Sequence, residues 1–228
     1  KVYIHESDTT SWLANKIISK IATKIFYTFT NDLIDDKKHI LTWQILNPEL
    51  LNKVDNSLEY IDENEKLEVL VIAWSQWSTT IFNNLKSVLN NLTNINFTII
   101  LWNKNTNFKN EFELFNNVKV YDFVNQEDLW EIYKKTDIAI SRAWATTLWE
   151  LYFFWIHSII IPLSNSANNH QLTNWEYFKK EFWSDLILEN QDLNLEIYRI
   201  LSKYKDLRKN WLNLNWFFYA LEQIKKHI

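Results

Sequence analysis

Three short segments of this 228-residue chain place polar side chains in a turn before a predicted helix. The first, residues 73–78, follows an apolar run and contains Ser75 and Gln76. A loop of this kind places main-chain N–H groups at the positive end of a helix dipole, where they bind anions. We predict a phosphate site here. The alternative is an ordinary strand-to-helix turn.

The second segment, residues 141–150, repeats this pattern, and residues 145–147 form the first turn of its predicted helix. Glu150 follows one turn later, where a carboxylate can accept two hydrogen bonds from a ribose diol. The alternative is an acid stabilised by the helix dipole. For Arg142 the two alternatives are contact with a phosphate and pairing with a surface carboxylate.

The third segment, residues 168–174, gathers amides and one imidazole at the start of another predicted helix. Amides read sugar hydroxyls well because they both donate and accept hydrogen bonds. Helix caps and surface polar groups are the alternatives. His170 alone is too little for a metal site. No Ser-His-Asp arrangement or paired glycosidase carboxylates can be identified from the sequence.

Glycine is absent from the chain, whereas tryptophan occurs 13 times. Average usage gives about 16 glycines at this length, and glycine is needed where φ is positive or where the backbone approaches a ligand closely. Trp12, Trp43, Trp155 and Trp183 stand at such turn and cap positions. We predict that most or all of the tryptophans are encoded by UGA and read as glycine in the cell. The alternative is a chain with real indoles in its loops.

An alternation of short apolar strands and amphipathic helices positions these segments. Strands are predicted over residues 2–5, 24–29, 39–42, 68–73, 97–101, 118–123, 138–141, 158–162 and 185–188, and helices over 13–21, 79–91, 126–134, 145–154, 169–182, 193–205 and 216–226. This alternation predicts an α/β fold with parallel strands and helices on both faces. Continuously apolar runs at residues 69–72 and 159–161 are typical of strands covered on both sides.

Composition excludes several classes of protein. The net charge of −4 and the pI of about 5.8 argue against a general nucleic-acid-binding surface. The lack of cysteine excludes a disulfide framework and a thiolate metal site. No segment has the length of a membrane span. The chain starts at Lys1 and has no methionine, from which we expect an N-terminally truncated protein.

With glycine at the tryptophan positions, the three segments together resemble the MurG family of peptidoglycan N-acetylglucosaminyltransferases. Residues 4–8 resemble that family's His-Glu-Gln-Asn segment, and residues 42–44 resemble its Thr-Gly-Asn turn. The motifs occur in the family's order over nearly the whole chain. The resemblance implies a GT-B fold of two Rossmann-like doubly wound domains, the first of them incomplete. It also implies inverting transfer of N-acetylglucosamine from UDP-N-acetylglucosamine to the 4-hydroxyl of the MurNAc of lipid I.

The resemblance further implies a role for each matching residue. The loop at Ser75 would contact phosphates, the main chain of Val124 would contact uracil, Glu150 would bind the ribose diol, and Gln171 would bind the sugar. The implied substrate-binding residues are Ser75, Val124, Ala145, Thr146, Thr147, Leu148, Trp149, Glu150 and Gln171, with Asp8, Asn47, Trp74, Gln76, Trp77, Arg142 and Asn174 as further contacts.

The sequence departs from the family pattern at three places. The family's asparagine at the end of its His-Glu motif is Asp8 here, and its arginine after the Gly-Asn turn is Asn47. The family's glycine-rich acceptor loop, with its proposed catalytic histidine, has no counterpart and would precede Lys1. We therefore expect no catalytic base, metal or cofactor in these residues, and no transfer by them alone.

The predicted organisation has four parts. Residues 1–56 end the acceptor domain, 57–66 form a linker, 67–212 form the donor-binding domain, and 213–228 return as a helix to the first domain. The resemblance implies a peripheral protein on the cytoplasmic face of the bacterial plasma membrane, acting on undecaprenyl-linked lipid I in cell-wall synthesis, and hence in cell shape and division. The alternatives are another GT-B UDP-sugar transferase, a non-catalytic nucleotide-sugar-binding module, and a nucleotide-sugar epimerase of related fold.

Overall fold

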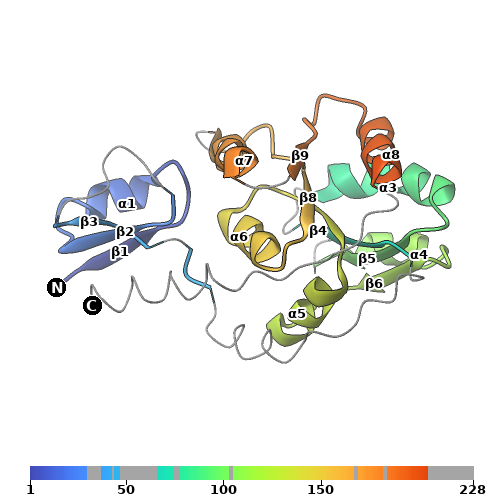
Figure 1. The fold of residues 1–228 in the computed structure, drawn as a ribbon, viewed down its shortest axis with the longest axis horizontal. Coiled ribbons are helices and arrows are strands. Elements are labelled where there is room, and N and C mark those ends of the chain that lie inside the picture. Colours follow the sequence, from blue (N-terminus) through green and yellow to red (C-terminus); the bar gives the residue numbers. More distant parts are fainter. Residues whose placement is uncertain are drawn as a thin grey trace.

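The computed structural model describes residues 1–29, 37–42, 44–46, 66–73, 78–102, 105–166, 169–181 and 184–204. Two parallel sheets occupy them (Figure 1). The small sheet has the order β1-β2-β3, and the large sheet has the order β6-β5-β4-β7-β8-β9. None of the described helices has both the length and the apolar character that crossing a bilayer requires.

The small sheet consists of β1 (Tyr3–Glu6), β2 (Lys24–Tyr27) and β3 (His39–Leu41), all parallel. Helix α1 (Leu13–Ile18) connects the first two strands. The core beneath this helix is small, with Ala22, Ile25 and Tyr27 buried against Ile4. The apolar residues of α1 itself are not buried, so most of this helix faces outward.

The large sheet is covered by helices on both faces. Its strands are β4 (Glu68–Ile72), β5 (Asn96–Ile100), β6 (Val118–Tyr121), β7 (Ile138–Ser141), β8 (His157–Ile160) and β9 (Ser184–Leu186). Its α-helices are α3 (Thr79–Asn91), α4 (Lys109–Phe112), α5 (Gln126–Lys135), α6 (Ala145–Phe153), α7 (His170–Glu181) and α8 (Leu193–Lys203).

Strand β4 explains why two separate cores form. Successive side chains of a strand point to opposite faces, so Val69 and Val71 join the core under α3, α4 and α8, while Leu70 and Ile72 join the core under α5, α6 and α7. Figure 1 shows these two groups of helices on opposite sides of the sheet. All four side chains are at most 1% exposed. The predicted α/β class with strands covered on both sides is therefore confirmed.

The strand order reverses direction at one position in the large sheet. From β4 the chain moves outward through β5 and β6, then returns to place β7 on the other side of β4. The connections that leave β4 and β7 therefore diverge to opposite faces. In open α/β sheets ligands bind at such a switch point, beyond the carboxyl ends of the strands.

The predicted elements agree with the described ones, with errors mainly at the ends. The nine predicted strands and the six predicted helices that fall on described residues are present, and two of them, at residues 79–91 and 138–141, match to the residue. The prediction for the first helix was wrong at its end, since α1 stops at Ile18. The predictions for β2 and β6 were two residues too long.

One helical segment was missed. A 3-10 turn (Thr106–Phe108) runs into α4, whose Phe112 is buried with Phe108 under the large sheet. Four residues are too few to show a helical period in the sequence. The predicted helix at residues 216–226 lies outside the described residues, and so do residues 47–65 and 205–228 around the predicted domain boundaries, which therefore stay predictions.

Candidate functional site

The site predicted from the sequence falls at the switch point between β4 and β7. The loop after β4 holds Trp74, Ser75, Gln76 and Trp77, which lie outside the described residues, as does Asn47. On the other side, β7 ends at Ser141 and the chain enters α6 after three residues. The N-terminus of α6 therefore lies at the edge of the sheet where a ligand would bind.

The start of α6 suits an anion. Trp144 occupies the N-cap position, and its side chain makes no capping hydrogen bond. Helical geometry leaves the N–H groups of the first turn without partners inside the helix, and the helix dipole makes this end positive. Ala145 and Thr147 are buried in this turn, whereas Thr146 is exposed. A phosphate at this end would accept hydrogen bonds from main-chain N–H groups.

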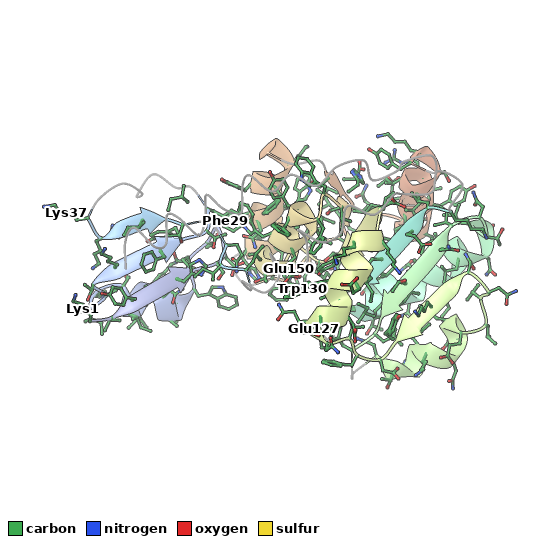
Figure 2. The ribbon with its side chains drawn as sticks, turned by 60° about the horizontal axis from the view of Figure 1, so that its bottom comes forward. Lys1, Phe29, Lys37, Glu127, Trp130 and Glu150 are labelled. Atoms are coloured by element: carbon green, nitrogen blue, oxygen red, sulfur yellow. The ribbon has the colours of Figure 1, made fainter. Side chains whose placement is uncertain are left out.

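Glu150 lies one turn further along α6 and is only 8% exposed. Burial raises the pKa of Glu150 to about 7, and a hydrogen bond from Tyr133 opposes this rise. The Tyr133 hydroxyl donates to Glu150 Oε2 at 3.0 Å. Figure 2 labels Glu150 beside Trp130, which belongs to the same helix as Tyr133. A buried carboxylate that titrates near neutral pH is typical of a binding or catalytic site.

Gln171, in the first turn of α7, is completely buried. Its Oε1 accepts a hydrogen bond from the main-chain N–H of Leu163 at 2.9 Å. Its Nε2 is buried and has no hydrogen-bond partner within the described residues. Leaving a buried amide donor unpaired costs about 1–3 kcal/mol. A ligand that accepts a hydrogen bond from this nitrogen would remove that cost.

Asn174, on α7, joins the large-sheet unit to the segment that follows β1 of the small sheet. Its Nδ2 donates to Asp8 Oδ1 at 2.7 Å and to the carbonyl of Ala143 at 3.2 Å. Its Oδ1 accepts hydrogen bonds from the N–H and the hydroxyl of Thr9, both at 2.9 Å, and the Thr9 hydroxyl also contacts that of Thr173 at 2.7 Å. Two residues expected to contact the ligand, Asp8 and Asn174, thus contact each other here.

A second contact joins the small sheet's residues to α6. Gln44 Nε2 donates to the hydroxyl of Thr146 at 3.4 Å, and Gln44 Oε1 accepts from the hydroxyl of Thr28 at 3.1 Å. The segment after β3 therefore borders the N-terminus of α6. The residues of both sheets converge where the predicted site lies.

Arg142 pairs with a carboxylate in the structure, which is the second of the two alternatives stated for it. The Arg142 side chain is 1% exposed, and Nη2 lies 2.7 Å from Glu189 Oε1. Its Nη1 donates to the carbonyl of Ile161 at 3.0 Å. The side chain of Glu189 is itself only 13% exposed, so this is a covered ion pair and not a surface one.

Two tryptophan side chains fill space beside the predicted sugar site. The rings of Trp12 and Trp144 lie 5.3 Å and 5.6 Å from the ring of His170, between ring centroids. His170 directly precedes Gln171, so the N-cap residues of α1 and α6 both place an indole at the start of α7. Glycine at positions 12 and 144 would leave that space to a ligand.

The remaining predicted contacts are core residues. The side chains of Val124, Leu148 and Trp149 are buried in the core under α5, α6 and α7. Only the main-chain atoms of these three residues are therefore suited to contact a ligand. Sequence reasoning missed Tyr133 and Thr9. A tyrosine on an apolar helix face is usually an ordinary core residue, so the sequence held no signal for the first. Thr9 adjoins the predicted contact Asp8.

Known proteins resemble this chain over most of its length. Residues 68–215 match the model of the glycosyltransferase family 28 C-terminal domain. A protein of Sulfurihydrogenibium sp. is 30% identical over 201 residues, which is 87% of this chain and 55% of that protein. A protein of Clostridium perfringens is 31% identical over 214 residues, or 92% and 58% of the two chains. Both are named UDP-N-acetylglucosamine–N-acetylmuramyl-(pentapeptide) pyrophosphoryl-undecaprenol N-acetylglucosamine transferase.

Solved structures share the fold. The crystal structure of MurG from Acinetobacter baumannii matches with a TM-score of 0.67 at 16% identity, over 99% of this chain and 61% of that one. A putative UDP-N-acetylglucosamine 2-epimerase from Listeria monocytogenes matches with a TM-score of 0.66 at 11% identity, over 100% and 68% of the two chains. The expected GT-B type of fold is confirmed.

These matches also show what share of the relatives' length the chain covers. The chain spans 55–60% of the length of the curated relatives described above and of their close counterparts in other clostridia. The family model, in contrast, covers well over half of the 228 residues. The chain therefore belongs to glycosyltransferase family 28.

Proposed function

We propose that the chain binds UDP-N-acetylglucosamine and supplies the donor side of an enzyme that transfers N-acetylglucosamine to lipid I in peptidoglycan synthesis. One observation carries the proposal: the uncapped N-terminus of α6 lies at the β4–β7 switch point, and the same helix carries the buried carboxylate of Glu150. A positive helix end suits a diphosphate, and a carboxylate one turn further suits a ribose diol. The names of the relatives support the choice of sugar and acceptor.

The chemistry asks two things of such a site. Departure of UDP requires that negative charge on the β-phosphate be stabilised, and preorganised main-chain N–H groups at a helix end supply this. The attacking 4-hydroxyl of the muramoyl sugar must also lose a proton to a general base. Attack from the face opposite the leaving UDP inverts the sugar's anomeric centre. We assign no base among these residues.

Three ligand measurements separate the competing functions. We expect isothermal titration calorimetry to detect UDP-N-acetylglucosamine binding to this chain, and a longer protein in which an acceptor domain precedes these residues to transfer the sugar to lipid I. Binding without transfer by that longer protein would favour a nucleotide-sugar-binding module. Release of UDP with no acceptor present would favour the epimerase, whose fold matches this chain equally well. Transfer to a different acceptor would favour another UDP-sugar transferase.

Replacing Gln171 is expected to weaken binding of the sugar but not of the nucleotide. Gln171→Leu removes the unpaired Nε2 donor that we assign to a sugar oxygen. The loss of one or two hydrogen bonds from a buried donor corresponds to about 1–3 kcal/mol, or roughly a 5- to 150-fold weaker affinity for UDP-N-acetylglucosamine. Calorimetry with UDP alone should give an affinity within about twofold of wild type, because UDP lacks the sugar that Gln171 is proposed to bind.

Gln191 provides the matched control. It is exposed, and its Oε1 accepts from the main-chain N–H of Leu188 at 2.7 Å, as Gln171 does from Leu163. Gln191→Leu should therefore cost a similar local contact and leave sugar binding unchanged. Equal losses of UDP and UDP-sugar affinity in Gln171→Leu would show that Gln171 has only a structural role.

We further propose that α1 makes peripheral contact with the membrane. Leu13, Ile17 and Ile21 are 72%, 61% and 72% exposed at four-residue spacing, and Lys16 and Lys20 lie between them and are also exposed. Leu13 and Ile17 lie in α1 and Ile21 in the turn after it, and exposed apolar side chains flanked by lysines suit the interface of an anionic bilayer. This surface supports the predicted location at a membrane.

Vesicle flotation tests the membrane contact. Ile17→Glu should reduce recovery of the chain with vesicles containing anionic phospholipid by roughly tenfold, because burying an isoleucine contributes about 1.5–3 kcal/mol. Leu114→Glu is the control, since Leu114 is 81% exposed but lies on the large-sheet side, next to α4. If both variants bind vesicles like wild type, α1 is not the contact surface.

A further inference from the structure

Resting on the proposed function, we infer that Tyr133 is a positioning residue for the nucleotide: its buried hydroxyl orients the Glu150 carboxylate to accept the ribose diol and favours the ionised form of that carboxylate. Tyr133 does not touch the ligand in this arrangement. It acts through Glu150, from a different helix.

The geometry places the two side chains in one rigid core. Tyr133 on α5 is completely buried and Glu150 on α6 nearly so, and both helices cover the same face of the large sheet. The tyrosine ring packs against Phe154, with ring centroids 5.2 Å apart. From this fixed position the hydroxyl donates to Glu150 Oε2 at 3.0 Å. Because packing fixes the tyrosine ring, the hydrogen bond from its hydroxyl restricts the orientation of the Glu150 carboxylate.

The hydrogen bond occupies only part of the carboxylate. Within the described residues Tyr133 donates to Oε2 of Glu150, and Oε1 accepts no hydrogen bond. A carboxylate has about four acceptor sites on its two oxygens. Tyr133 therefore leaves Glu150 able to accept from two adjacent hydroxyl groups, which is the pattern that a ribose presents.

The charge state of Glu150 decides whether it can do so. Burial raises its pKa to about 7, and the Tyr133 hydrogen bond lowers it. Among the described titratable groups, none from α6, α7 or the sheet adds to these two effects. Burial and the nearby carboxylate raise the pKa of Tyr133 itself, so it remains a donor throughout the neutral range. Tyr133 is thus the group that opposes protonation of Glu150.

Tyr133→Phe removes the hydroxyl and keeps the ring. We expect the variant to bind UDP roughly three- to tenfold more weakly than wild type at pH 7, and within about twofold of it at pH 8.5, where Glu150 is ionised in both proteins. The midpoint of the pH dependence of UDP affinity should move upward. A ligand without the diol, 2′,3′-dideoxy-UDP, should show neither effect.

Two further measurements keep the inference open to refutation. Tyr152→Phe, on the same helix as Glu150 but outside this hydrogen bond, controls for loss of a hydroxyl and should keep the wild-type pH profile. If Tyr133→Phe does not fold, 3-fluorotyrosine at position 133 should donate more strongly and shift the midpoint downward. A wild-type protein that binds UDP, with an unchanged profile when Tyr133 is altered, overturns the inference. If the wild-type protein does not bind UDP, the proposed function itself is contradicted.

Discussion

Glycine in place of Trp12, Trp102, Trp144 and Trp155 is expected to stabilise the fold and to raise the affinity for UDP-N-acetylglucosamine by roughly 100-fold, or about 2.8 kcal/mol. The two effects have separate origins. Positions 102 and 155 affect stability through the backbone, and positions 12 and 144 affect binding through the space they fill.

Trp155 ends α6 in a conformation that suits glycine. Its φ is 54°, its N–H donates to the carbonyl of Tyr152, and the N–H of Ile156 donates to the carbonyl of Leu151. This is the Schellman arrangement, in which the left-handed residue is usually glycine. Trp102, after β5, has a φ of 59°. A side chain in this region costs about 1–2 kcal/mol per residue, so Trp155→Gly should raise the free energy of unfolding by that amount.

Trp12 and Trp144 oppose binding sterically. Both indoles lie against His170 at the start of α7, and His170 directly precedes Gln171 in the chain. The indole nitrogen of Trp144 is buried and also has no hydrogen-bond partner within the described part of the chain. Removing the two side chains would open room for a sugar and let the main chain at residue 144 approach a phosphate. Calorimetry on the double variant Trp12→Gly/Trp144→Gly measures this effect.

Trp130 supplies the internal control. It lies in the middle of α5, is 1% exposed and belongs to the core. Trp130→Gly should therefore destabilise the protein, by at least the roughly 3–5 kcal/mol of a large-to-small core change. UGG codons at positions 102 and 155 in the gene, or a loss of stability in Trp155→Gly, would show that the tryptophans there are genuine.

Local patterns made most of the fold predictable. Helix α3 buries Ile81, Phe82, Leu85, Val88 and Leu89, a stripe at helical spacing that the sequence displays directly. Strand β7 is four buried residues between polar neighbours. The α6 N-terminus and Glu150 were predictable for the same reason, since a strand, a turn and a helix start follow one another along the chain.

Features that depend on distant segments were not predictable. The Tyr133–Glu150 hydrogen bond exists because α5 packs against α6, and 17 positions separate the two residues. The contact between Asp8 and Asn174 joins positions 166 apart. No periodicity in the sequence specifies which helices become neighbours. Arg142 illustrates the same limit, because no local pattern in the sequence identifies Glu189 as its partner.

Removing the carboxylate of Glu189 is expected to be the most destabilising single change at the site's edge. Glu189→Ala would remove the carboxylate that pairs with the buried Arg142 charge, and breaking a buried pair from one side costs about 3–5 kcal/mol. Thermal unfolding should shift downward by roughly 6–20 °C for a protein of this size. Glu196→Ala is the matched control, because Glu196 pairs with the exposed Arg199 at the same 2.7 Å distance. An exposed pair contributes at most about 1 kcal/mol.

The pair also predicts how stability depends on pH. Burial tends to raise the pKa of Glu189, but hydrogen bonds from Ser164 and the charge of Arg142 outweigh it and hold this pKa below the ordinary glutamate value. A carboxyl with a lowered folded-state pKa stabilises the protein above its unfolded pKa, and this contribution is lost as the pH falls through the folded value. The difference in stability between wild type and Glu189→Ala should therefore shrink in acid. If Glu189→Ala unfolds no more easily than Glu196→Ala at neutral pH, Arg142 does not need its carboxylate, and contact with a ligand phosphate becomes the better account of this arginine.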